Sequence, residues 1–404
     1  MSDLSTNKKS MLAVRNLGLS LLGLTGAVSM IGLALLSGVV TLLTMESGLS
    51  NQQEVYNLVW IFGFFAVLLL PFMIITFYQL QDKPQPSWLR FPVLTPRILL
   101  ISLAIWVFIL GSSYWVGQIA PSFWLIMPPL KIFAVVLPLG LIISYLAEKF
   151  RPVQPSRTWG LISFSLVLTE PITILLEGIF IVFFMIGLAV TMDWSQVLGS
   201  EAYVYLNRLM VGMNNPDILS RLLTPFLTQP AILFILFVLF SLVVPVIEEI
   251  MKPMALWFLN KKEILPRDGF YYGALTGMVF ALIESILGLT GFGADGWVSI
   301  SIVRLGTGIL HVFTSALMGW ALTESWHAYR LGKLSLTFLF CVAVHGLWNF
   351  LAISISINDL IPMAVNPQQG VIRILFPAIL VLMALGMLLG LLRVGRKLGH
   401  AHQN

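Results

Sequence analysis

The feature that most constrains this chain is a succession of apolar stretches, each about as long as a membrane is thick, from near the first residue to near the last. A helix needs about 20 consecutive apolar residues to cross the hydrocarbon core of a bilayer. The sequence therefore predicts an all-α fold, a polytopic bundle of about ten transmembrane helices. The predicted spans are 17–44, 58–78, 98–119, 130–147, 159–191, 229–257, 269–290, 301–322, 335–356 and 371–393.

Composition excludes most other classes of protein. Hydrophobic residues make up 58% of the 404 residues and charged residues only 10%, whereas soluble domains are roughly 45–50% apolar. The net charge of +5 comes from basic residues in short loops beside apolar spans, so we expect no nucleic-acid partner. The single cysteine, Cys341, excludes intrachain disulfides and Cys-x-x-Cys sites.

The basic residues predict the orientation of the spans. Lysine and arginine gather in every second loop, and loops rich in these residues face the cytoplasm. These loops contain Lys8, Lys83, Arg151, Lys262, Arg330 and Lys397. Both termini are thus predicted to be cytoplasmic, with the first span kept as an anchor, in a multi-pass protein of the plasma (inner) membrane. The longest opposite connection, 192–229, is predicted to form amphipathic surface helices.

Polar residues divide the chain unevenly. Residues 1–228 read as a transmembrane scaffold with one extracytoplasmic loop, residues 229–356 as a catalytic-type core, and residues 357–404 as the last span with a cytoplasmic tail. Ionisable residues inside a bilayer are costly and mark functional sites or ion pairs. Most of them fall in the core, although Glu170 and Glu177 lie in the fifth span and belong to no motif.

The sixth span ends in "VPVIEEIMK", which places two carboxylates side by side near a lysine. Lys252 lies four residues after Glu248, on the same helix face, so the two can pair. Glu249 points about 100° away. A snorkelling ion-pair cluster at a helix end is the alternative to a catalytic role for these three residues.

The next three spans each carry further polar residues. "FALIE" places Phe280 and Glu284 on one helix face, "HVFTS" holds His311, and "HGLWN" sets His345 one turn before Asn349. Short loops make consecutive helices antiparallel neighbours, so these side chains can line one polar cavity. Both histidines fall near the middle of their spans, although His311 taken alone reads as a hydrogen-bonded packing residue rather than a ligand.

"EEIMK", "FALIE", the histidine at position 311 and "HGLWN" together resemble the motifs of the PrsW family of intramembrane proteases, E-E-x-x-K, F-x-x-x-E, a lone His and H-x-x-x-D. Asn349 departs from that pattern and matches the more distant CAAX-type prenyl endopeptidases and bacteriocin-processing proteins. The resemblance covers residues 245–350. It implies a metallopeptidase whose substrate is a membrane-spanning protein or peptide, by family likeness an anti-sigma factor.

The residue types fit peptide hydrolysis, which needs an activated water, a proton acceptor and donors to the oxyanion. Glu248 or Glu249 could be the base and Asn349 an oxyanion donor. Glu284, His311 and His345 match the two-His, one-Glu ligand set of catalytic zinc sites, with a metal-free glutamate–water mechanism as the alternative. A pairing of Cys341 with His345 is a further, weaker reading because burial disfavours a thiolate.

Two functions outside proteolysis remain open. Buried glutamates and histidines also relay protons, so a proton-coupled secondary transporter is one alternative. Such carriers show paired broken helices, whereas only one polar span, with Pro245, shows a proline interruption to the eye. A non-catalytic membrane sensor is the other alternative.

Overall fold

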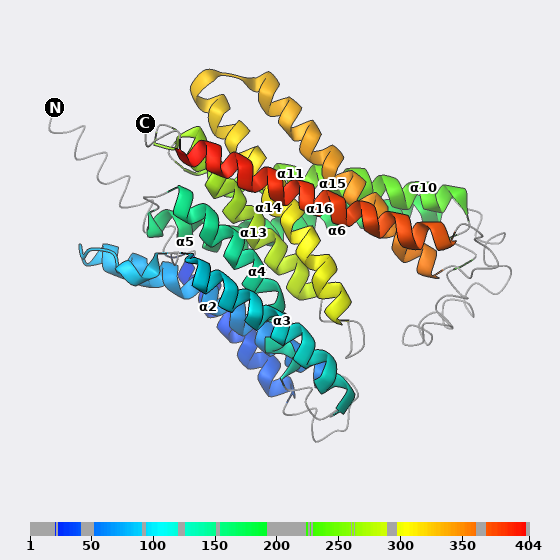
Figure 1. The fold of residues 1–404 in the computed structure, drawn as a ribbon, viewed down its shortest axis with the longest axis horizontal. Coiled ribbons are helices and arrows are strands. Elements are labelled where there is room, and N and C mark those ends of the chain that lie inside the picture. The colour runs from blue at the N-terminus through cyan, green and yellow to red at the C-terminus, as the bar shows by residue number, and fades with distance from the viewer. Residues whose placement is uncertain are drawn as a thin grey trace. The chain divides into compact units, whose positions relative to one another are not determined.

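The structure, a computed structural model, describes residues 23–41, 52–90, 94–119, 126–150, 154–191, 229–259, 263–288, 297–360 and 369–400, with a few single residues between them (Figure 1). All regular elements in these ranges are helices, which confirms the predicted all-α class. The surface helices predicted within 192–229 lie almost entirely outside the described residues.

The predicted spans correspond to the observed helices. Nine of the described helices are long and apolar enough to cross a membrane, and α3, with its apolar run at Pro96–Ser112, matches the remaining prediction. The helices are Gly23–Thr41, α2 Gln52–Leu80, α3 Pro96–Ile119, α4 Met127–Lys149, α5 Pro155–Phe164, α6 Glu170–Thr191, α10 Pro230–Val238, α11 Val244–Met251, α12 Met254–Trp257, α13 Pro266–Gly288, α14 Trp297–Ala328, α15 Leu331–Leu360 and α16 Gln369–His400, with a 3₁₀ turn η1 at Ser87–Leu89.

Proline marks where many of these helices begin. The first turns of α3, α4, α5, α10 and α13 each contain one. Proline suits this position because its fixed φ fits the helix and its missing N–H would have no intrahelical partner there. The proline-rich connections thus set the helix starts within a few residues of the predicted ones.

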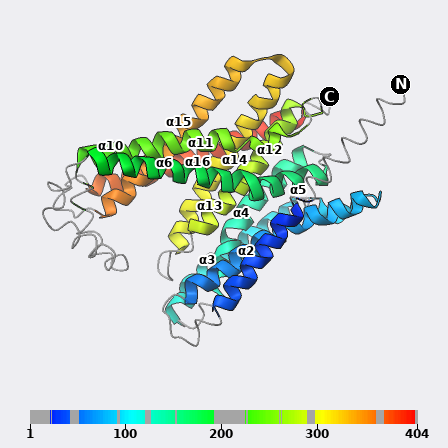
Figure 2. The ribbon, with the colours of Figure 1, turned by 180° about the vertical axis from the view of Figure 1, so that it is seen from behind.

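The chain divides into two compact units, each built from several separate segments. Unit one contains Met1–Pro171, Lys252–Leu334 and Met387–Asn404, and unit two contains Ile172–Met251 and Ser335–Gly386. Within unit one, α13 is the central helix, with 89% of its most apolar stretch buried. The helix Gly23–Thr41 packs beside α2, where a Cβ at Gly23 would meet the ring of Phe72 (Figure 2).

A stripe of glycines brings α13 and α14 into backbone contact in unit one. Gly269, Gly273 and Gly277 recur every fourth residue and so lie on one face of α13. A Cβ on Gly273 would overlap the carbonyl oxygen of Ser315, and one on Gly277 would overlap that of His311. Small residues at this spacing let membrane helices approach closely, and the close packing fixes the height of His311 against α13.

Two of the described spans are each interrupted by a π-helical segment. A π-helical segment, η3 (Ser165–Thr169), joins α5 to α6, and another, η5 (Leu239–Val243), joins α10 to α11. In both, the second residue of the following helix is proline, Pro171 or Pro245. The sequence analysis identified only the second interruption, from Pro245, although Pro171 is equally visible in the sequence. Such segments are frequent at functional sites.

Candidate functional site

In unit two, two neighbouring glutamates of α11 approach one histidine of α15. The Nδ1 atom of His345 lies 2.9 Å from Oε1 of Glu249, within hydrogen-bond distance. Glu249 is fully buried, and His345 is only 1% exposed. When Glu249 is ionised and His345 is neutral, the carboxylate accepts this bond, so Nδ1 donates it and Nε2 carries the lone pair. In that state Glu249 sets both the orientation and the tautomer of His345.

Glu248 faces the other nitrogen of the same ring. Its Oε2 lies 3.7 Å from Nε2 of His345, too far for a direct hydrogen bond. A separation of this size suits two groups that hold a water or an ion between them. Glu248 is 6% exposed, so the pair is shielded from bulk solvent.

Asn349 connects this pair to the interrupted helix. The N–H of Val244 donates to the carbonyl of Leu239, and the next residue, Pro245, has no N–H to offer. The carbonyl oxygen of Phe240 therefore lacks a donor from its own helix, and Nδ2 of Asn349 donates to it at 3.0 Å. One turn away on α15, a Cβ on Gly346 would overlap the carbonyl oxygen of Ser241. These contacts hold His345 against the helix that carries both glutamates.

In unit one, a second glutamate–histidine pair joins α13 to α14. Nε2 of His311 lies 2.7 Å from Oε2 of Glu284, and Arg304 donates to Oε1 of the same carboxylate at 2.6 Å. His311 is 1% exposed, and the side chain of Glu284 is 40% exposed. Arg304 precedes His311 by seven residues, two helical turns, so both project from one face of α14. Gly288 leaves room for the guanidinium of Arg304, which a Cβ there would overlap.

An aromatic ring and a lysine complete the surroundings of His311. The ring of Phe280 lies 5.0 Å from the imidazole of His311, between centroids. Nζ of Lys252 lies 4.9 Å from the centre of the Phe280 ring, in cation–π geometry. Lys252 is 1% exposed. Phe280 of the "FALIE" stretch therefore contacts both the charged group and the imidazole.

Sequence reasoning identified the glutamates, the histidines and Asn349 but missed two residues that position them, Arg304 and Gly277, and one contact, that of Asn349 with Phe240. Arg304 read as a basic residue at the end of a span, although its spacing from His311 was visible. Gly277 belongs to a G-x-x-x-G-x-x-x-G series that the sequence displays openly. The contact of Asn349 with Phe240 could not be found, because it depends on the π segment.

The sequence analysis also named Glu170, which belongs to no motif. Its side chain lies in unit one and is buried, at 3% exposure.

The helices and buried charges define a class: an integral, multi-pass membrane protein whose helices carry glutamate–histidine pairs. A profile of the PrsW family, intramembrane metalloproteases, matches residues 174–385, just over half of the chain. The chain belongs to the PrsW family. The match contains all four motifs and extends to both sides of them. Comparisons with curated proteins and with solved structures give no match to this chain.

Proposed function

We propose that this chain is an intramembrane endopeptidase that hydrolyses a peptide bond of a membrane-associated protein with a water activated by Glu248 and His345. One observation carries the proposal: each of the two histidines has a glutamate bound to one ring nitrogen, Glu249 on His345 and Glu284 on His311. Metal-binding histidines nearly always donate their other ring N–H to a carboxylate, a backbone carbonyl or a water, which orients the ring and raises its basicity. Family membership supports the same chemistry.

The donor set fits a zinc ion. Two ligands each bound about 2.0–2.2 Å from a tetrahedral zinc lie roughly 3.3–3.6 Å apart, close to the 3.7 Å between Oε2 of Glu248 and Nε2 of His345. We propose that His345, His311 and Glu248 would hold the metal, in a two-His, one-Glu set. A bound zinc ion supplies a Lewis acid that polarises the scissile carbonyl and acidifies a water.

The sequence analysis expected Glu284 to be a metal ligand, whereas in this proposal it is a positioning residue. Both of its oxygens are engaged, one by Arg304 and one by His311. The guanidinium offsets its charge, so Glu284 suits orienting His311 better than binding a metal. Glu249 is the corresponding positioning residue for His345.

In this scheme the proton of the attacking water goes to Glu248, on the carboxylate oxygen that a bound metal would leave free. Its carboxylate faces Nε2 of His345 in a buried site, and a positioned carboxylate can take a proton from an attacking water. Glu248 then donates the proton to the departing amide nitrogen. We propose that Asn349 is a positioning residue, because its amide already donates to Phe240, and that Lys252 places positive charge near the developing oxyanion.

The substrate class follows from where the site lies. His311 and His345 are near the middle of membrane helices, so we propose a membrane-spanning protein or peptide as substrate, with an anti-sigma factor as the specific candidate by family resemblance. Plasma-membrane localisation is part of the same proposal.

Comparing the membrane proteins of cells with and without the chain tests this function. We expect at least one single-span protein to be shortened within its membrane segment only in cells that express the wild-type chain. Cells that express Glu248→Gln at equal level should show the full-length protein. An unchanged set of membrane proteins, together with a proton-coupled flux that depends on Glu248, would replace the protease with the transporter.

A further inference from the structure

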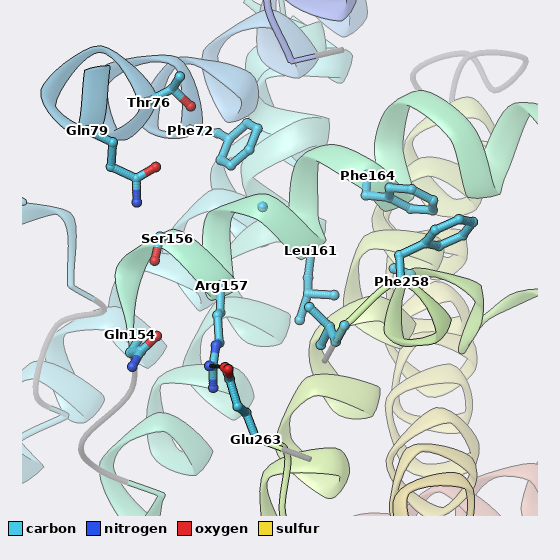
Figure 3. Close-up of a pocket in the computed structure, with 13 residues that line it drawn as sticks. Phe72, Thr76, Gln79, Gln154, Ser156, Arg157, Leu161, Phe164, Phe258 and Glu263 are labelled. Carbon is cyan, nitrogen blue, oxygen red and sulfur yellow. Dashed lines mark hydrogen bonds and ion pairs between the residues drawn. The ribbon is translucent and has the colours of Figure 1, made fainter. Parts of the chain in front are cut away.

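Unit one contains a pocket at the ends of α2, α5 and α12 (Figure 3). Its volume is about 230 Å³, and it opens to the surface. Since a water occupies about 30 Å³ of liquid, the pocket has room for a small polar group of about eight non-hydrogen atoms but not for a whole lipid or a folded peptide. The motif residues do not line it, so the proposed protease does not explain it.

The lining changes from polar to aromatic across the pocket. Figure 3 shows Gln154, Ser156, Arg157 and Glu263 on one side and Phe164 and Phe258 on the other. The rings of Phe164 and Phe258 pack together at 4.9 Å between centroids. An amphiphile would find hydrogen bonds at one end and an apolar wall at the other.

The pocket lies at the level where phospholipid head groups are expected. α2 ends at Leu80, α5 begins at Pro155 and α12 ends at Trp257. The loops next to these three ends carry Lys83, Arg151 and Lys261, the basic residues that predict the cytoplasmic side. In this predicted orientation, a ligand of the pocket would come from the cytoplasmic leaflet rather than from the bilayer centre.

Charge selects the head group. Arg157 and Glu263 are the two ionisable residues of the lining and form an ion pair with each other, so the lining is neutral overall. A guanidinium has five N–H donors, which leaves donors for a phosphate beside the bond to Glu263. A carboxylate and the amide oxygens of Gln79 and Gln154 suit a primary ammonium, which has three N–H donors. A purely anionic head group would meet the Glu263 charge, and a quaternary ammonium has no N–H to donate.

We propose that this pocket binds the zwitterionic phosphoethanolamine head group of a phospholipid, with its phosphate on Arg157, its ammonium on Glu263 and its glycerol end directed toward Phe164 and Phe258, while the acyl chains stay outside the pocket. The inference is independent of the catalytic proposal.

Lipid retention by the purified full-length chain in detergent tests the site. Native mass spectrometry should show about one phosphatidylethanolamine retained per chain, and this lipid should raise the Tm more than phosphatidylglycerol or phosphatidylcholine does. Arg157→Gln and Glu263→Gln should each weaken retention about tenfold, the effect of losing one charge-assisted hydrogen bond. Ser156→Phe, which fills the pocket without touching the ion pair, should also abolish retention.

The matched control is Arg330→Gln. Arg330 forms a 2.9 Å ion pair with Glu324 on the same predicted side of the membrane but does not line the pocket, so retention should not change. Equal retention of all three lipids, or full retention of phosphatidylethanolamine by both Arg157→Gln and Ser156→Phe, would overturn the proposal. So would soluble O-phosphoethanolamine raising the Tm as much as the lipid at equal concentration, since the ligand would then not be a lipid.

Discussion

The carboxamide of Asn349 donates a 3.0 Å hydrogen bond to the carbonyl oxygen of Phe240, the oxygen that Pro245 and the π segment leave without a donor from its own helix. A buried carbonyl that loses its only donor costs about 1–3 kcal/mol. Asn349 thereby secures the contact between the helix of His345 and the helix of Glu248 and Glu249.

Replacing Asn349 by leucine should lower the stability of the chain by about 1–3 kcal/mol and reduce proteolysis as His345 shifts. Thermal unfolding in detergent measures the first effect and cleavage assays the second. The double variant with Pro245→Ala should recover part of the loss, because it restores an N–H to the interrupted helix. Additive losses in the double variant would show that the amide serves a purpose other than supplying this carbonyl.

Arg304→Gln should leave the fold intact and lower activity by about 10- to 100-fold, the usual effect of removing a residue that orients a metal-binding histidine. The reason is that Glu284 loses the hydrogen bond from Arg304 that holds its carboxylate against His311. Arg304→Lys should restore part of the activity through a single bond. The control is Arg373→Gln, which breaks an exposed ion pair with Asp359; an equal loss there would remove the argument for Arg304.

Gly277→Ala should destabilise the chain by about 1–3 kcal/mol, because the new Cβ would overlap the carbonyl oxygen of His311 and push α14 away from α13. Gly140→Ala offers a matched control within α4, where a Cβ meets open space. This control should be neutral or slightly stabilising because alanine favours the helix. Equal melting temperatures for the two variants would contradict close packing of α13 on α14.

The apolar runs were sufficient to predict the helices. Each predicted span has an observed counterpart, and the proline-rich connections fix where helices such as α5 and α13 begin. The largest error is in α16, which continues to His400, seven residues past its predicted end. The α14 helix continues to Ala328, six residues past its predicted end, because its last turns carry polar residues such as Thr323 and Ser325 that pack inside unit one.

The candidate site could be predicted only as a set of residue types. Spacing along one helix showed that His345 and Asn349 share a face, but not that Glu249 binds Nδ1 while Glu248 faces Nε2. That distinction depends on the rotation of α11 after the π segment, and apolar periodicity carries no signal for an extra residue in a turn. Arg304 was missed because a basic residue near a span end usually marks topology.

Metal content separates the two forms of the mechanism. Purified wild-type chain should hold about one zinc, as a catalytic site does, and His345→Ala or His311→Ala should lose it. Glu284→Gln should keep the metal with weaker affinity, as expected of a positioning residue. His327→Ala, at a histidine that bonds the carbonyl of Ile264, should have no effect. Active protein with no metal would leave the glutamate–water mechanism without zinc.

Cleavage by the purified chain in proteoliposomes tests the central claim most directly. Single-span membrane proteins reconstituted with the wild type should yield products whose new termini lie within the membrane segment, as read by mass spectrometry. Glu248→Gln keeps the shape of the side chain but cannot take a proton, so it should cleave at least about a hundredfold more slowly. Glu177→Gln, outside the motifs, should cleave at the wild-type rate. Cleavage by Glu248→Gln at the wild-type rate would contradict the proposal that Glu248 activates the water.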